Sequence, residues 1–272
     1  MKKILITLLI GILIIIAGAG LMVYGYTRDD FSLDQYEMEN FEKEEFTYLK
    51  EDFSTINFDS EIENFKIIVT EEDIFKIEGK KSENIYYEYK LENNTLTIKQ
   101  HWKDKIRLLF SFDETNITSP YIVYVPKDSL KELNVNIKVG NIDINDIILD
   151  KLSVNVKTGD VKIKNVFSKN LDVVCNTGNV DVNANDCINI NININVGDLE
   201  LITNQAFDVN LSLNTGKISF EGKINNSGYF KCNVGDVNLI LFGNDYNINN
   251  TGNGKTKITT DVDLGNLHYQ YK

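Results

Sequence analysis

The sequence predicts an all-β fold: a parallel β-helix, or β-solenoid, of 19-residue coils, preceded by one N-terminal transmembrane helix. Three observations support this prediction. Glycine recurs every 19 residues through the second half of the chain, apolar and polar residues alternate on both sides of each glycine, and a long uncharged segment stands near the N-terminus. A fixed period of this size indicates a repeat architecture in which each unit is one turn of a solenoid.

The N-terminal segment has the length and composition of a membrane span. Residues 4–26 contain no charged side chain, and a helix of that length crosses a bilayer core of about 30 Å. Two lysines precede the segment and two aspartates follow it, so residues 1–27 are predicted to be a cytoplasmic tip and anchor with the rest of the chain extracytoplasmic. Ala17-Gly18-Ala19 also fits a signal-peptidase site, but the apolar run continues beyond it, which favours a retained anchor.

An acidic segment follows the predicted anchor. Residues 28–52 hold ten acidic and three basic side chains, a composition typical of a solvated spacer, here an acidic stalk. The formal net charge of the whole chain is −12. This charge argues against nucleic acid or anionic lipid headgroups as partners of the folded domain.

Residues 53–132 are predicted to form the N-terminal β cap and the first coils. Short alternating segments separated by turn residues indicate strands. These segments are Ile56–Phe58, Phe65–Val69, Phe75–Ile77, Tyr87–Tyr89 and Leu96–Ile98. A separate small β domain is the alternative, although the chain holds only two prolines and no Pro-rich linker divides it.

Residues 133–254 are predicted to be the regular coils. Each glycine marks a corner between two short strands, where a backbone bend is cheap only without a Cβ. The turn glycines are Gly140, Gly159, Gly178, Gly197, Gly216 and Gly235. A β-branched residue precedes each glycine, and Asn, Asp or Lys follows it. Coils stacked about 4.8 Å apart would turn each sequence column into a ladder of like side chains.

The end of the repeat is irregular. A seventh turn is predicted at residues 251–254, where the glycine spacing shortens. Terminal repeats of solenoids differ from the others because they must cover an open sheet edge. Residues 255–272 are therefore predicted to be the C-terminal cap.

Three cysteines give no disulfide framework. Cys175 and Cys232 share one column but stand three coils apart, about 14 Å at the ladder spacing, which is beyond disulfide reach. Cys187 stands at a different position in its coil, and the sequence leaves open whether it approaches Cys175. The packed core must then hold this domain together.

Catalytic and metal-binding residues are not indicated by the sequence. Asp181 and Glu200 would be stacked neighbours, the nearest approach to a carboxylate pair, but their column has mixed charge and lacks histidine. An aspartate column at the corners suggests calcium, yet Asn and Lys interrupt it, and turn chemistry explains it without a metal. That column contains Asp160, Asp198 and Asp236. His101 and His268 lack metal-ligand spacing, so no catalytic residue, metal ligand or cofactor is predicted.

One segment between the predicted strands is rich in aromatic and basic residues. It packs across the open solenoid end as part of the cap, or it forms a partner-binding loop. The candidate binding residues are Trp102, Lys103, Lys105, Arg107, Phe110 and Phe112.

The order of these features resembles a bacterial family of unknown function known as "putative adhesin" proteins. The resemblance rests on the N-terminal apolar segment, the run Tyr121-Ile122-Val123-Tyr124-Val125-Pro126, and repeated Thr-Gly-Asp-Val and Val-Gly-Asp-Val units, and it covers roughly residues 50–265. It implies a bacterial envelope protein with a solenoid outside the membrane. Some members look linked to envelope-stress signalling, and no catalytic residues come with the family.

The sequence thus favours a membrane-anchored extracytoplasmic β-solenoid that acts without catalysis in cell-envelope contacts or adhesion. An accessory regulator of envelope-stress signalling and a carbohydrate-active β-helix enzyme are the alternatives. The expected partners are the membrane, through residues 4–26, and envelope proteins or surface glycans. The sequence does not indicate an oligomeric state.

Overall fold

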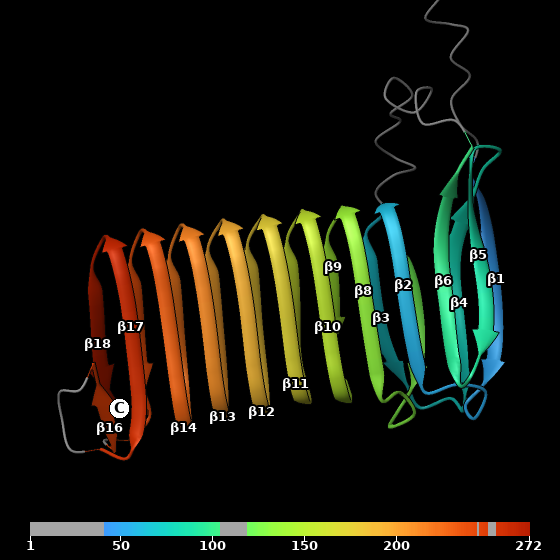
Figure 1. The fold of residues 1–272 in the computed structure, drawn as a ribbon. Coiled ribbons are helices and arrows are strands. Elements are labelled where there is room, and N and C mark those ends of the chain that lie inside the picture. The colour runs from blue at the N-terminus through green and yellow to red at the C-terminus, as the bar shows by residue number, and fades with distance from the viewer. Residues whose placement is uncertain (1–40, 104–118, 244, 250–253) are drawn as a thin grey trace, which may run out of the picture. The chain divides into compact units, whose positions relative to one another are not determined.

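The computed structural model describes residues 41–103, 119–243, 245–249 and 254–272, all of which belong to one compact unit. Within these ranges the chain forms strands and turns, and the strands join one curled sheet of 18 strands (Figure 1). Only three pairings in the described part are antiparallel, and all of them lie among the N-terminal strands. The prediction of an all-β, mostly parallel fold is confirmed.

The 19-residue period is the offset between neighbouring parallel strands. One ladder joins Val154, Val173, Ile192, Leu211 and Phe230, each 19 residues after the one before. The regular coils are built from β8 (Glu132–Val139), β9 (Ile142–Asn145), β10 (Ile148–Thr158), β11 (Val161–Thr177), β12 (Val180–Val196), β13 (Leu199–Thr215) and β14 (Ile218–Val234). Each of β11 to β14 begins just after one glycine corner and ends just before the next.

The corner glycines are required by two features of the backbone. All six have φ between 136° and 144°, a region that side-chain-bearing residues rarely adopt. The stacked corners also approach closely: a Cβ added to Gly178 would collide with the carbonyl oxygen of Gly159, and the same relation recurs from coil to coil. The glycine period therefore records both the bend and the tight stacking of the bends.

The residue after each glycine holds consecutive coils together. The side-chain oxygen of Asn141 accepts a hydrogen bond from the Asp160 N–H (2.9 Å), and Asp160 accepts one from the Asn179 N–H (2.7 Å). Asn179 and Asp198 repeat the contact with the next backbone N–H. We call this series the corner ladder. It gives the Asn and Asp residues of this column a structural role.

Alternate residues of every coil point into a continuous apolar core. The inward members of the ladder through Val154 and Phe230 are 0–2% exposed. Cys175, Cys187 and Cys232 are also buried, and all three are free thiols. Side chains buried in this way each contribute about 1.5–3 kcal/mol relative to exposure.

The N-terminal strands continue the same sheet. β2 (Thr55–Ile62) and β3 (Phe65–Thr70) pair in parallel with β8 and β9, and on their other side with β6 (Thr95–Trp102) and β7 (Tyr121–Pro126). The described part of residues 53–132 therefore stacks on the coils and is not a separate β domain. Three antiparallel additions complete this end: β1 (Glu42–Leu49), β4 (Ile74–Lys81) and β5 (Ile85–Glu92).

The acidic stalk was predicted to include residues 28–52, but part of this range belongs to the sheet. β1 lies inside that range and pairs with β4 over eight residues, because Phe46 and Tyr48 alternate with charged and polar residues and pack against the core. Residues 28–40 and the predicted span 4–26 lie outside the described residues. Among the described residues, no helix has the length and apolarity needed to span a bilayer.

The C-terminal strands differ from the expected cap. β17 (Thr256–Leu264) and β18 (Leu267–Tyr271) pair in parallel with β14 and with β15 (Val237–Leu241), so residues 255–272 largely form one more coil. Its corner is Gly265, with φ 155°, which follows Gly235 by 30 residues. The short strand β16 (Tyr246–Ile248) lies within the added length and pairs with the start of β17. The seventh turn predicted at 251–254 falls mostly outside the described residues.

Candidate functional site

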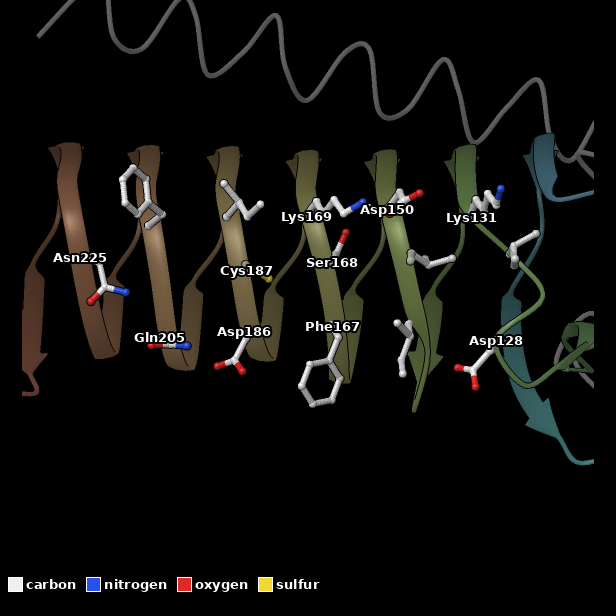
Figure 2. A pocket seen from close by; sticks show the side chains of 15 residues that line it. Asp128, Lys131, Asp150, Phe167, Ser168, Lys169, Asp186, Cys187, Gln205 and Asn225 are labelled. Carbon is white, nitrogen blue, oxygen red and sulfur yellow. Dashed lines mark ion pairs between the residues drawn. The ribbon is translucent and has the colours of Figure 1, made fainter.

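A groove of about 450 Å³ crosses the coils on the side away from the glycine corners (Figure 2). We call it the coil groove. Its lining comes from the turn before β8 and from β10 to β14, at the bend in the middle of each long strand. The lining residues used below are Lys131, Ile148, Leu149, Asp150, Phe167, Ser168, Lys169, Asp186, Cys187, Ile188, Gln205 and Phe207.

Small side chains make the groove hollow. Leu149, Ser168, Cys187 and Ala206 occupy one inward column at the bend and are 0–7% exposed. In the coils of Ser168, Cys187 and Ala206 this position holds only one or two side-chain heavy atoms, which leaves a depression along the stack. Ser168 donates its hydroxyl to the Asn170 carbonyl oxygen and is thereby satisfied within its own coil.

Four large apolar side chains stand exposed around this depression, one on each of four consecutive coils. Ile148, Phe167, Ile188 and Phe207 are between 38% and 53% exposed. The outward columns on other faces are mainly Asn, Asp, Lys and Ser. They form two pairs of neighbours on opposite sides of the inward column, Ile148 with Phe167 and Ile188 with Phe207. Apolar side chains gathered in one groove beside polar residues are typical of an interaction site.

The rims of the groove are polar and carry both charges. Figure 2 shows Lys131, Asp150 and Lys169 along one rim, and Asp186 and Gln205 along the other. Lys169 lies 2.6 Å from Asp150, and its hydrogen bond to that carboxylate lowers the pKa of Asp150. One outward column runs through four consecutive coils. Its residues are Asp150, Lys169, Ile188 and Phe207, in that order.

The chemistry of the groove favours binding over covalent reaction. Burial raises the pKa of Cys187 to about 11, so this thiol is protonated at neutral pH and a poor nucleophile. Among the described residues, no group of three or more His, Cys, Asp or Glu is placed to hold a metal ion. Apolar contacts and the polar rim are therefore the means by which the coil groove can hold a ligand.

A second polar cluster is buried at the corner between β2 and β3. Glu63, 4% exposed, accepts hydrogen bonds from the Tyr87 hydroxyl (2.5 Å) and from the Asn64 N–H (3.0 Å). Lys80 Nζ lies 3.5 Å from the Glu63 carboxylate, and Gln100 donates to the Tyr87 hydroxyl. Burial is the main cause of a raised pKa at Glu63. These contacts satisfy the carboxylate within the fold, which indicates a structural role.

The predicted aromatic and basic loop is divided by the structure. Trp102 is the last residue of β6 and donates its ring N–H to the Gln100 side-chain oxygen (2.8 Å), so it belongs to the sheet. Lys103 lies over the Tyr86 ring at 5.9 Å. The remaining candidates, Lys105, Arg107, Phe110 and Phe112, lie outside the described residues.

The residues considered for catalysis or calcium have ordinary surface surroundings. Asp181 and Glu200 are paired neighbours on β12 and β13, and Lys162 flanks Asp181 on the other side. Asp160 and Asp198 each accept a backbone N–H in the corner ladder. His101 lies 2.8 Å from Glu88, on the hairpin of β5 and β6.

Sequence reasoning missed the coil groove. The signal is present: aligning the chain on the glycines places Ile148 and Phe167 in one outward column, and Ile188 and Phe207 two residues further along. The prediction considered only the columns beside each glycine and did not compare these more distant columns.

The family model described as Toastrack DUF4097 matches residues 53–260. The chain belongs to this family. The match runs from β2 to the first half of β17 and thus includes the coil groove. No curated protein gives a significant match to this Toastrack DUF4097 chain.

Solved structures related to this Toastrack protein share low sequence identity with it. A putative adhesin from Bacteroides fragilis is 15% identical, with a TM-score of 0.48, and the match covers 84% of this chain and 97% of that one. A putative adhesin from Parabacteroides distasonis is 14% identical over 85% of this chain and 97% of that one, with a TM-score of 0.37. A putative cell adhesion protein from Clostridium sporogenes is 12% identical over 86% and 100%, with a TM-score of 0.36.

Proposed function

We propose that this Toastrack DUF4097 protein is a membrane-anchored, extracytoplasmic and non-enzymatic binding protein that acts in cell-envelope contacts or adhesion. The observation behind this proposal is the coil groove, with four exposed apolar side chains on four consecutive coils. Four such side chains in one hollow exceed the scattered apolar residues of an ordinary soluble surface. The names of the related structures agree with a role in adhesion.

The proposed location rests on the sequence of residues 4–26 and the lysines before it. Protease treatment of intact cells, compared with permeabilised cells, tests the orientation. The β domain should be cleaved in intact cells once any outer barrier is removed. Protection of this domain until the cytoplasmic membrane is opened would overturn the proposed topology.

A protein is the partner that best fits the coil groove. Its apolar anchors would take apolar side chains, and Asp186 and Gln205, together with the Asp150–Lys169 pair, provide hydrogen-bonding groups at the rims for a partner backbone. The groove crosses at least four coils, which is about 14 Å at the ladder spacing. A segment of about four extended residues spans that distance.

Site-specific photocrosslinking tests this proposal in the native membrane. A photoreactive residue at Phe207 should give a covalent protein adduct, whereas the same residue at Tyr229 should not. Tyr229 is a matched control because it is an exposed aromatic residue on a neighbouring coil, outside the groove lining. The change Phe167→Ser should abolish the adduct, and Val174→Ser, an exposed apolar position on the same strand, should leave it unchanged. An adduct that resists protease but is removed by glycosidases would contradict a protein partner.

A further inference from the structure

We propose that the last coil is a docking site for an extended polypeptide strand of a partner protein, which adds in parallel to the free edge of β18. This site, the C-terminal edge, consists of the end of β17, the corner Gly265-Asn266 and β18. It is separate from the coil groove and does not depend on the function proposed there. Four features of the described residues support it.

The first feature is a row of unpaired backbone groups on β18. The Val237 N–H donates to the Asn266 carbonyl oxygen, and the Lys272 N–H donates to the Leu241 carbonyl oxygen, both at 2.9 Å. In a parallel ladder the direction of the hydrogen bonds alternates along the strand. The N–H and C=O groups of Leu267, Tyr269 and Tyr271 therefore face away from β15, toward a side where the described part of the chain places no strand.

The second feature is the open end of the corner ladder. Asn266 donates both its backbone and side-chain N–H to Asp236 Oδ1, at 2.9 and 3.1 Å. In the regular coils from Asn141 to Asp198, the side-chain oxygen at this position accepts the N–H of the following coil. Within the described residues, no backbone N–H of a following coil donates to the Asn266 side-chain oxygen.

The third feature is exposure of the inward column. Tyr269 and Tyr271 are each 48% exposed, whereas Leu239 and Leu241, their partners one coil earlier, are 1% and 0% exposed. Tyr269 and Tyr271 continue the core columns, so a strand added here would bury them as every earlier coil buries its neighbour.

The fourth feature is the lack of protection at this edge. Natural sheets block free edges with charges, proline or covering segments. β1, the opposite edge strand, begins Glu-Lys-Glu-Glu, and β16 with the Asn249 side chain covers the first half of β17. β18 reads Leu-His-Tyr-Gln-Tyr and lacks both proline and acidic residues.

These features also define the occupant. Backbone pairing supplies affinity in strand addition, and pockets for alternate side chains supply specificity. The ligand is an extended segment with apolar residues at alternate positions, running in the direction of β18, with a free N–H at the level of Asn266. A coil sequence of this protein has these properties, so Gly-Asp-Leu-Glu-Leu-Ile-Thr, the sequence of residues 197–203, serves as the probe.

The experiment measures binding of this peptide to the full 272-residue chain by fluorescence anisotropy. Wild type should bind, and a peptide with proline in place of its central residue, Glu200, should not, because the Glu200 N–H would face β18 and proline removes that ladder donor. The variant Tyr269→Lys should weaken binding by about tenfold or more, since it places a charge in the inward column. The control His268→Lys points to the other face of β18 and should stay within about twofold. Both variants should retain the wild-type circular dichroism.

Three results would overturn the proposal. One is no binding of the peptide to wild type. Another concerns a spin label on the N-terminus of the peptide. If the label broadens the NMR signal of the Tyr271 amide and not that of the Leu267 amide, the strand adds in the antiparallel direction. The last is a dimer of the full chain in sedimentation that Tyr269→Lys dissociates, because a second copy would then be the occupant. Binding with the predicted variant pattern and monomeric wild type would support it.

Discussion

At the scale of single residues, the corner ladder explains a column that first suggested calcium. Each Asn or Asp after a corner glycine uses its side-chain oxygen to hold the backbone of the next coil, which is a contact that a free side chain in a turn often makes with its own chain. Lys217 occupies the same column, and its ammonium group cannot accept a hydrogen bond. The ladder is therefore interrupted between the coils of Lys217 and Asp236.

Restoring the acceptor should stabilise the protein. The change Lys217→Asn places a side-chain oxygen opposite the Asp236 N–H, and one such hydrogen bond contributes about 0.5–1.5 kcal/mol. We expect the free energy of unfolding in urea to rise by about that amount. The matched variant Asn179→Ala removes the acceptor of the Asp198 N–H and should lower the free energy of unfolding by a similar amount. A destabilised Lys217→Asn would show that the side-chain contact follows from the stacking and does not contribute to it.

At the scale of elements, the predictability of this protein follows its regularity. The regular strands after Gly140 could be predicted because one period fixes both the corner and the inward columns, as the glycine φ values and the 19-residue offsets show. The N-terminal strands lack that period: β4 to β7 stand between β3 and β8 in the sequence, so β2 and β3 pair with β8 and β9 at an offset of 77 residues, and Glu63 stands at their corner where later coils have glycine. Nothing local to Thr55–Thr70 specifies that β6 and β7 pair beyond them. The coil groove was missed for a similar reason, since its four apolar residues are divided between two outward columns on either side of an inward one.

The Glu63 corner should make stability depend on pH. Burial raises the pKa of Glu63 in the folded state, so the folded protein binds more protons than the unfolded chain once pH exceeds the ordinary glutamate value of about 4.3. Stability contributed by this group is then greatest at low pH and is lost as pH rises through the raised pKa. Glu63→Gln keeps the shape and the acceptor for Tyr87 but cannot titrate.

The test is the free energy of unfolding in urea from pH 4 to pH 8. As the pH rises over this range, the free energy of unfolding of the wild type should fall relative to that of Glu63→Gln. Glu71→Gln provides the control, because this carboxylate is on the surface, with a side chain 87% exposed, and should follow the wild type. Parallel pH profiles for Glu63→Gln and wild type would show that Lys80 and Tyr87 fully offset the burial of the charge.

At the scale of the whole described unit, the two ends of the stack are unequal. The N-terminal end buries an aromatic cluster that includes Phe53, Phe58, Phe75 and Tyr121, all about 1% exposed or less. The C-terminal end leaves Tyr269 and Tyr271 of the inward column 48% exposed each. In stacked repeats stability is approximately a sum of terms from each unit and from its interfaces with its neighbours, so opening should begin where a terminal unit has only one strong interface.

The labelling rates of the buried cysteines measure the order in which the coils open. Cys232 on β14 has only the coil of β17 and β18 beyond it, whereas Cys175 on β11 has three more regular coils as well, and both are at most 1% exposed. Pulse labelling with a thiol reagent in mild urea, resolved by mass spectrometry and normalised to the unfolded chain, should therefore modify Cys232 before Cys175. We expect a rate ratio of about tenfold or more, since each tenfold step needs only about 1.4 kcal/mol of difference in opening free energy. The peptide of residues 197–203 should slow the labelling of Cys232 and leave that of Cys175 unchanged, because it would cover the end from which opening starts. Equal rates for the two thiols would mean that the coils open together, and the exposed end would then have no separate stability.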